Sequence, residues 1–108
     1  MTVKELAQKA GFESVLLPDG DREVSGAYIG DLLSWVMGRA QSGNVWITIM
    51  SNLNVVAVAS LSDVACVLLA EGVELSEDAK EAAKDKEINI LRSEKSSYEL
   101  AVLLGKLI

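Results

Sequence analysis

Two short, almost entirely apolar segments, Val45–Met50 and Ala65–Ala70, most constrain the fold of this chain. Uninterrupted aliphatic segments of this length are typical of strands that are buried on both faces of a sheet. If the two strands are parallel neighbours, the residues between them are about as many as a crossover helix requires, roughly a dozen. We therefore expect a helix over Asn52–Asp63, although the apolar run Val55–Ala59 also fits a buried strand of a hairpin.

The other elements are predicted from apolar spacing and from helix-start signals. Apolar positions recur at helical spacing from Asp31 to Ala40, and the carboxylate of Asp31 suits the positive start of a helix. Ser14–Leu17 and Arg22–Ser25 are expected to be brief extended pieces that form an edge of the sheet, and Ile88–Leu91 a further strand. Capping residues predict three more helix starts, at Thr2, Ser76 and Ser96.

This order of segments predicts an α/β fold, a mostly parallel sheet covered by helices, with residues 1–108 as one domain. Half of the residues are hydrophobic, and the apolar segments Val55–Ala59, Val64–Ala70 and Leu100–Leu104 exceed what we expect one small core to bury. We therefore predict a homodimer or larger assembly, with Trp35 and Trp46 as candidate interface residues.

Composition and charge exclude several classes of function. The formal net charge of −6 disfavours binding to nucleic acid or to anionic membranes. The absence of histidine excludes His-dependent catalysis and His-ligated zinc, and a single cysteine cannot form a disulfide or a Cys-only metal site within the chain. That residue, Cys66, lies in an apolar segment where packing is its expected role. Because Met1–Glu5 has no apolar leader, we expect a cytoplasmic protein. We also expect it to need no cofactor and no metal.

The candidate ligand site follows from the predicted topology. Ligands of parallel α/β sheets favour the loops that leave the carboxyl ends of the strands. Arg92 offers a planar cation there, and a helix start offers unpaired amides, so together they suit a small anion. We expect Arg92 to be exposed, so that Arg92→Ala abolishes ligand-induced stabilisation and barely changes the melting temperature of the free chain. The alternative is that the Ser and Asn residues only cap helices and that Arg92 pairs with Glu71 or Glu94. The candidate residues are Ser51, Asn52, Asn54, Gly72, Arg92, Ser93 and Ser96.

Four segments of the sequence carry a family resemblance: Val24–Ser34, Val45–Ile49, Asn54–Ala59 and Cys66–Leu91. Together they resemble the DRTGG domain, and the likeness covers about residues 22–107. The segment after Cys66 also resembles the N-terminal, non-kinase domain of HPr serine kinase/phosphatase.

This resemblance implies an α/β regulatory module, alone or attached to an enzyme, with no established catalytic residues of its own. The pentapeptide that names the domain is absent, and so is the P-loop of the HPr kinase. We therefore predict a non-catalytic regulatory or interaction module that binds a partner enzyme. The alternatives are a sensor of a small anion or nucleotide and, less favoured, a phosphotransfer enzyme.

Overall fold

The computed structural model describes residues 1–108 and contains five helices and five strands. The helices are α1 Val3–Ala10, α2 Leu33–Arg39, α3 Leu53–Ser62, α4 Glu77–Asp85 and α5 Ser97–Leu107. The strands are β1 Glu13–Leu16, β2 Ala27–Ile29, β3 Val45–Thr48, β4 Cys66–Leu69 and β5 Ile90–Arg92.

All five strands form one sheet in the order β1-β5-β4-β3-β2. Strands β2 to β5 are parallel, and β1 pairs antiparallel with β5 at one edge. Each parallel pair is joined by a helix, so the predicted α/β architecture is confirmed. The segment that also fitted a strand, Asn52–Asp63, is helical: Asn52 caps α3, and Asp63 ends it with a φ of 55°.

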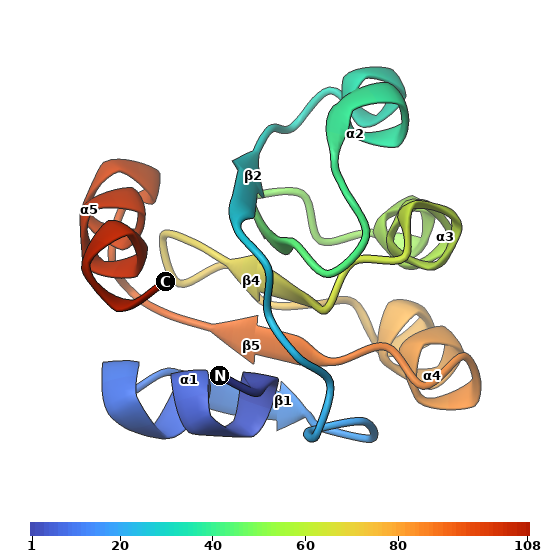
Figure 1. Ribbon diagram of the computed structural model, residues 1–108. Helices are drawn as coiled ribbons and strands as arrows, with labels where there is room; N and C mark the ends of the chain where they lie inside the picture. The colour runs from blue at the N-terminus through green and yellow to red at the C-terminus, as the bar shows by residue number, and fades with distance from the viewer.

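The sheet is the middle layer of three (Figure 1). Helices α2, α3 and α4 cover one face, where side chains such as Trp46 and Val67 from the strands form one apolar cluster with Val56. Helices α1 and α5 cover the other face, where Ile47 and Leu68 belong to a second cluster. Alternate strand residues thus supply both cores, which explains why β3 and β4 are apolar throughout. None of the helices has the length and apolar character needed to cross a membrane.

Local sequence signals fix several helix ends as predicted. The capping boxes of α1 and α5 are both formed: Thr2 Oγ1 accepts from the Glu5 amide at 3.1 Å, and Ser96 Oγ accepts from the Glu99 amide at 3.2 Å. Gly11 ends α1 with a φ of 72°.

The strand at the second edge of the sheet differs from the prediction. Arg22–Ser25 forms no strand, and within it only Glu23 makes a β-bridge, to Thr2. The edge strand is instead β2, between Gly26 and Gly30. The Gly26 carbonyl accepts from the Val45 amide at 3.0 Å, which joins the start of β2 to β3.

Asp31 does not start a helix as predicted, because Leu32 precedes the first residue of α2. The Asp31 carboxylate accepts from Thr48 Oγ1 at 2.7 Å and from the Ile49 amide at 3.0 Å. These hydrogen bonds connect the loop after β2 to the end of β3. The same carboxylate is therefore not available to cap α2.

The apolar segments behind the predicted assembly are mostly buried within the single chain. Residues 64–70 are all buried, as are four residues of α3 and both Leu100 and Leu104 of α5. Trp46 has no exposed surface, and its indole Nε1 donates to the Gly30 carbonyl at 2.9 Å. Trp46 is thus a core residue, and of the two tryptophans only Trp35 is accessible to a partner.

Candidate functional site

The carboxyl ends of the parallel strands lie on one edge of the sheet, and they carry the predicted ligand-site residues. Gly72, Arg92 and Ser93 are in direct contact there. The Gly72 amide donates to the Ser93 carbonyl at 2.9 Å, and the Arg92 guanidinium donates to the Gly72 carbonyl at 2.6 Å. Of the predicted site residues, only Arg92 and Ser93 line a hollow at this edge; the others, Ser51, Asn52, Asn54, Gly72 and Ser96, line neither of the two hollows beside Arg92.

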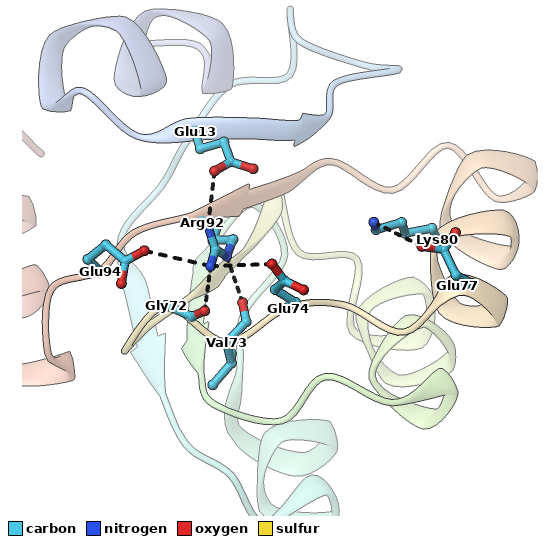
Figure 2. Close-up of polar contacts among 8 residues, drawn as sticks. All are labelled: Glu13, Gly72, Val73, Glu74, Glu77, Lys80, Arg92 and Glu94. Atoms are coloured by element: carbon cyan, nitrogen blue, oxygen red, sulfur yellow. Dashed lines mark hydrogen bonds and ion pairs between the residues drawn. The ribbon is translucent and has the colours of Figure 1, made fainter.

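The side chain of Arg92 is committed to the protein itself (Figure 2). Its Nε donates to the Val73 carbonyl at 3.0 Å, and its guanidinium also reaches Glu13 at 3.1 Å. Two more carboxylates stand nearby, Glu94 at 3.7 Å and Glu74 at 3.9 Å. The side chain is only 18% exposed, so the expectation of a free, exposed arginine is wrong.

The electrostatics around Arg92 oppose an anionic ligand. Three carboxylates face one guanidinium, so an incoming phosphate would meet an excess of negative charge. The neighbouring cation Lys80 turns to Glu77 instead, with its Nζ 3.3 Å from Oε1 (Figure 2). The hollows beside Arg92 have volumes of about 290 Å³ and 90 Å³, and both include Glu13.

The other predicted residues have local structural roles. The Asn52 side chain accepts from the Asn54 amide at 3.0 Å, which caps α3. The Ser51 carbonyl accepts from the Ser76 amide at 3.1 Å. Ser93 Oγ accepts from the Lys95 amide at 3.1 Å, and Ser96 caps α5. The polar groups of this edge therefore hold its loops in place.

Outside this edge, α2 and its N-cap residue leave large apolar side chains in solvent, and of these only Trp35 was predicted as an interface residue. Leu32 is 59% exposed, Trp35 52% and Met37 53%, while Val36 is the only fully buried residue of the helix. The Arg39 guanidinium lies 3.7 Å from the centre of the Trp35 ring, a cation–π contact that orients the indole. The sequence did carry a signal: apolar residues occupy more of Asp31–Ala40 than one buried helix face can use.

Neither the single cysteine nor the acidic side chains form a site suited to chemistry. Burial raises the pKa of the Cys66 thiol to about 12, so the thiol stays protonated and unreactive at neutral pH. No group of three or more Cys, Asp or Glu side chains is arranged so that it could hold a metal ion.

No protein-family profile and no curated protein matches this sequence. The fold, however, is similar to a solved structure: the CBS and DRTGG domains of the regulatory region of Clostridium perfringens pyrophosphatase, complexed with the activator diadenosine tetraphosphate. The TM-score is 0.72 at 15% sequence identity, over 94% of this chain and 45% of that chain.

This likeness supports the DRTGG-like fold that the sequence segments predicted. The chain spans less than half the length of the regulatory-region structure. The resemblance to the HPr kinase domain stays a prediction from the sequence.

Proposed function

We propose that this chain is a non-catalytic regulatory or interaction module that binds a partner protein, such as a larger enzyme, through the exposed apolar surface of α2. The observation that carries the proposal is the exposure of Leu32 at the N-cap of α2 and of Trp35 and Met37 within the helix, each more than half accessible to solvent. A helix of seven residues gains little stability from its own hydrogen bonds, and burial of its apolar side chains is its main source of stability. Large apolar side chains that stay exposed on and beside such a helix indicate that a partner covers them.

The composition of this surface matches that of protein interfaces. Tryptophan and arginine are the residue types most enriched among those that dominate binding energy. Trp35 and Arg39 are stacked on each other, so part of the ordering cost is met before a partner arrives. The stacking also leaves the Arg39 charge available for an acidic group at the rim of the interface.

The residues available for chemistry support a binding role. The chain lacks histidine, its only thiol is buried, and its best-placed cation, Arg92, is bonded to two backbone carbonyls and a carboxylate. Neither the Cys66 thiol nor the Arg92 guanidinium is free to transfer a proton or to hold a phosphoryl group. We therefore expect purified chain with ATP and Mg²⁺ to phosphorylate no protein, including HPr.

The test is affinity capture from the native cell with three forms of the chain: wild type, Leu32→Ser/Trp35→Ser, and Leu61→Ser. Leu61 is 74% exposed on α3, so the third form removes an apolar side chain that is even more exposed from another surface. A protein retained by wild type and Leu61→Ser but lost by the α2 variant supports the proposal. Retention of no protein, or equal retention by all three, contradicts it.

The second candidate function is a nucleotide-responsive sensor. It is favoured by one observation, that the structurally similar regulatory region was crystallised with diadenosine tetraphosphate. Thermal melts of this chain with diadenosine tetraphosphate, ATP and inorganic phosphate test it. A concentration-dependent rise in melting temperature with either nucleotide but not with phosphate would support a sensor. Unchanged melting at millimolar nucleotide would eliminate it.

A further inference from the structure

The two edges of the sheet are protected to different degrees. Natural proteins protect edge strands with charges, prolines or bulges, because the free backbone groups of a bare edge pair with other strands. The β1 edge has all three: Glu13, an irregularity between Ser14 and Leu16, and Pro18 shortly after the strand. The β2 edge has none of them, since no residue from Val24 to Gly30 is charged. Only its shortness protects it.

The backbone of β2 has hydrogen-bonding groups free on its outer side. The Gly26 carbonyl accepts from the Val45 amide, and the Gly30 amide donates to the Ile47 carbonyl at 3.2 Å. In a parallel ladder alternate residues face the neighbouring strand, so Tyr28 also bonds to β3. The amides and carbonyls of Ala27 and Ile29 therefore point away from the sheet.

An apolar groove runs beside this edge, between β2 and α5. Its volume is about 330 Å³, and no lining residue has a charged side chain. Ile29 is 45% exposed at the groove and Ile108 is 43% exposed, while Ile47 lies fully buried. On this face of the sheet only α1 and α5 provide cover (Figure 1), which leaves the β2 side of the groove open. The lining residues are Gly26, Ala27, Ile29, Ile47, Ala101, Leu104, Gly105 and Ile108.

We propose that a second copy of this chain occupies the β2 edge, with the two β2 strands paired antiparallel about a two-fold axis at Tyr28. In this register Ala27 of one copy lies opposite Ile29 of the partner subunit, and the outward backbone groups of both strands satisfy one another. The two sheets become continuous across the interface. The two grooves also meet on one face, so that Ile29 and α5 of each copy are buried against those of the other.

The geometry favours a second copy over a different protein. A two-fold contact needs a self-complementary surface. The outward backbone groups of Ala27 and Ile29 are complementary to those of a second β2 strand that runs antiparallel to the first. A stable dimer buries about 800 Å² per partner, roughly one-seventh of the 5536 Å² surface of this chain. The strand alone is too short to supply this area, so the proposed interface has to include the groove and the exposed side of α5.

Charge gives the association a distinctive salt dependence. Each copy carries a net charge of −6, so two copies repel each other at long range although the contact itself is uncharged. Added salt should therefore strengthen the dimer. A basic partner protein on the same surface would bind more weakly as salt increases.

This inference goes beyond the proposed function and uses a different surface. The α2 surface lies on the opposite face of the sheet from α5 (Figure 1), so the two proposals concern different faces.

The test measures mass by sedimentation velocity from micromolar to millimolar chain, at low and moderate salt. Wild type is expected at twice 11.6 kDa in the upper part of that range. Gly105→Glu places a charge in the groove without a clash, because nothing lies within 4 Å of an added Cβ there. Ile29→Lys adds a charge of the opposite sign, and Leu61→Lys on α3 is the matched control. Both groove variants should weaken the dimer at least about tenfold, whereas the control should not.

Hydrogen exchange on wild type provides a test that needs no variant. The amides of Ala27 and Ile29 should be protected at high concentration and exchange freely on dilution. A wild-type chain that stays monomeric throughout, a dimer that persists in both groove variants, or concentration-independent exchange at these amides would overturn the proposal. Capture of a partner by Gly105→Glu would show that the α2 surface functions without the dimer, so the two proposals can fail separately.

Discussion

Replacement of Arg92 by alanine should lower the melting temperature markedly, because this side chain joins three segments that are distant in the sequence. It donates to the carbonyls of Gly72 and Val73 and to the carboxylate of Glu13. With 18% of the side chain exposed, water can replace these partners only in part.

The size of the effect follows from the contacts that are lost. A hydrogen bond to a charged group contributes about 1.5–3 kcal/mol, and partial access of water reduces the sum. Loss of the cation also leaves Glu13, Glu74 and Glu94 close together without compensation. We expect a total loss of about 3 kcal/mol, which corresponds to a decrease in Tm of roughly 13 °C for a domain of this size.

Calorimetry and urea unfolding of Arg92→Ala, Arg92→Lys and Arg39→Ala provide the assay. Lysine keeps the charge but cannot reach two carbonyls and a carboxylate at once, so Arg92→Lys should be intermediate. The control Arg39→Ala removes an exposed arginine stacked on Trp35 and should cost less than about 1 kcal/mol. If Arg92→Ala melts within about 2 °C of wild type, Arg92 does not stabilise the fold. The hypothesis of a free arginine that binds an anion would then be favoured again.

Three further predictions concern other buried or paired groups. Asn89→Ala should cost about 2–3 kcal/mol in urea unfolding, because the buried Asn89 amide bonds to the Asp19 backbone and to the Ala65 carbonyl. Cys66, with its pKa raised by burial to about 12, should react with a thiol reagent only at the rate of unfolding, and fast labelling of the native chain would contradict this. Hydrogen bonds from Arg22 and then Ser42 lower the pKa of Asp63, so its stabilising effect is present above its unfolded value and is lost as pH falls through its folded value. Arg22→Gln should raise that pKa in an NMR titration and make stability less dependent on pH in the acid range.

Much of the fold could be predicted because its signals are local or depend on connection length. The capping pairs at Thr2 and Ser96 specify helix starts from residues only three apart. The assignment of Asn52–Asp63 to a helix followed from the length of a parallel crossover, which decided between two structures that hydropathy could not distinguish.

The edge strand β2 could not be predicted in the same way. Three residues between two glycines are too few to show an alternating pattern. Its position depends on pairing with β3 and on Asp31, whose partners Thr48 and Ile49 lie 17 and 18 residues further along the chain. No local signal distinguishes this use of an aspartate from the start of a helix.

The candidate ligand site shows the limit of reasoning from topology. Topology placed Gly72, Arg92 and Ser93 together correctly, because the carboxyl ends of neighbouring parallel strands must share an edge. Pairing of Arg92 with Glu94 was an alternative that the sequence offered, whereas its contact with Glu13 was not. Glu13 precedes Arg92 by 79 residues and arrives on β1, the one strand that runs antiparallel. The same antiparallel strand that completes the sheet therefore supplies the carboxylate that occupies the expected anion site.

The exposed surfaces at α2 and at the β2 edge are apolar, unlike the charged loop edge around Arg92. At the loop edge, three carboxylates surround the one guanidinium of Arg92, so an anionic ligand would be repelled. At α2 and β2, charges are sparse, and Trp35 and Ile29 remain about half exposed although a core was available to other residues of the same elements. Water is displaced from such surfaces at a gain in free energy, whereas displacement of the carboxylates around Arg92 would cost free energy. The energetics of the folded chain therefore favour recognition of apolar protein surface over recognition of a small anion.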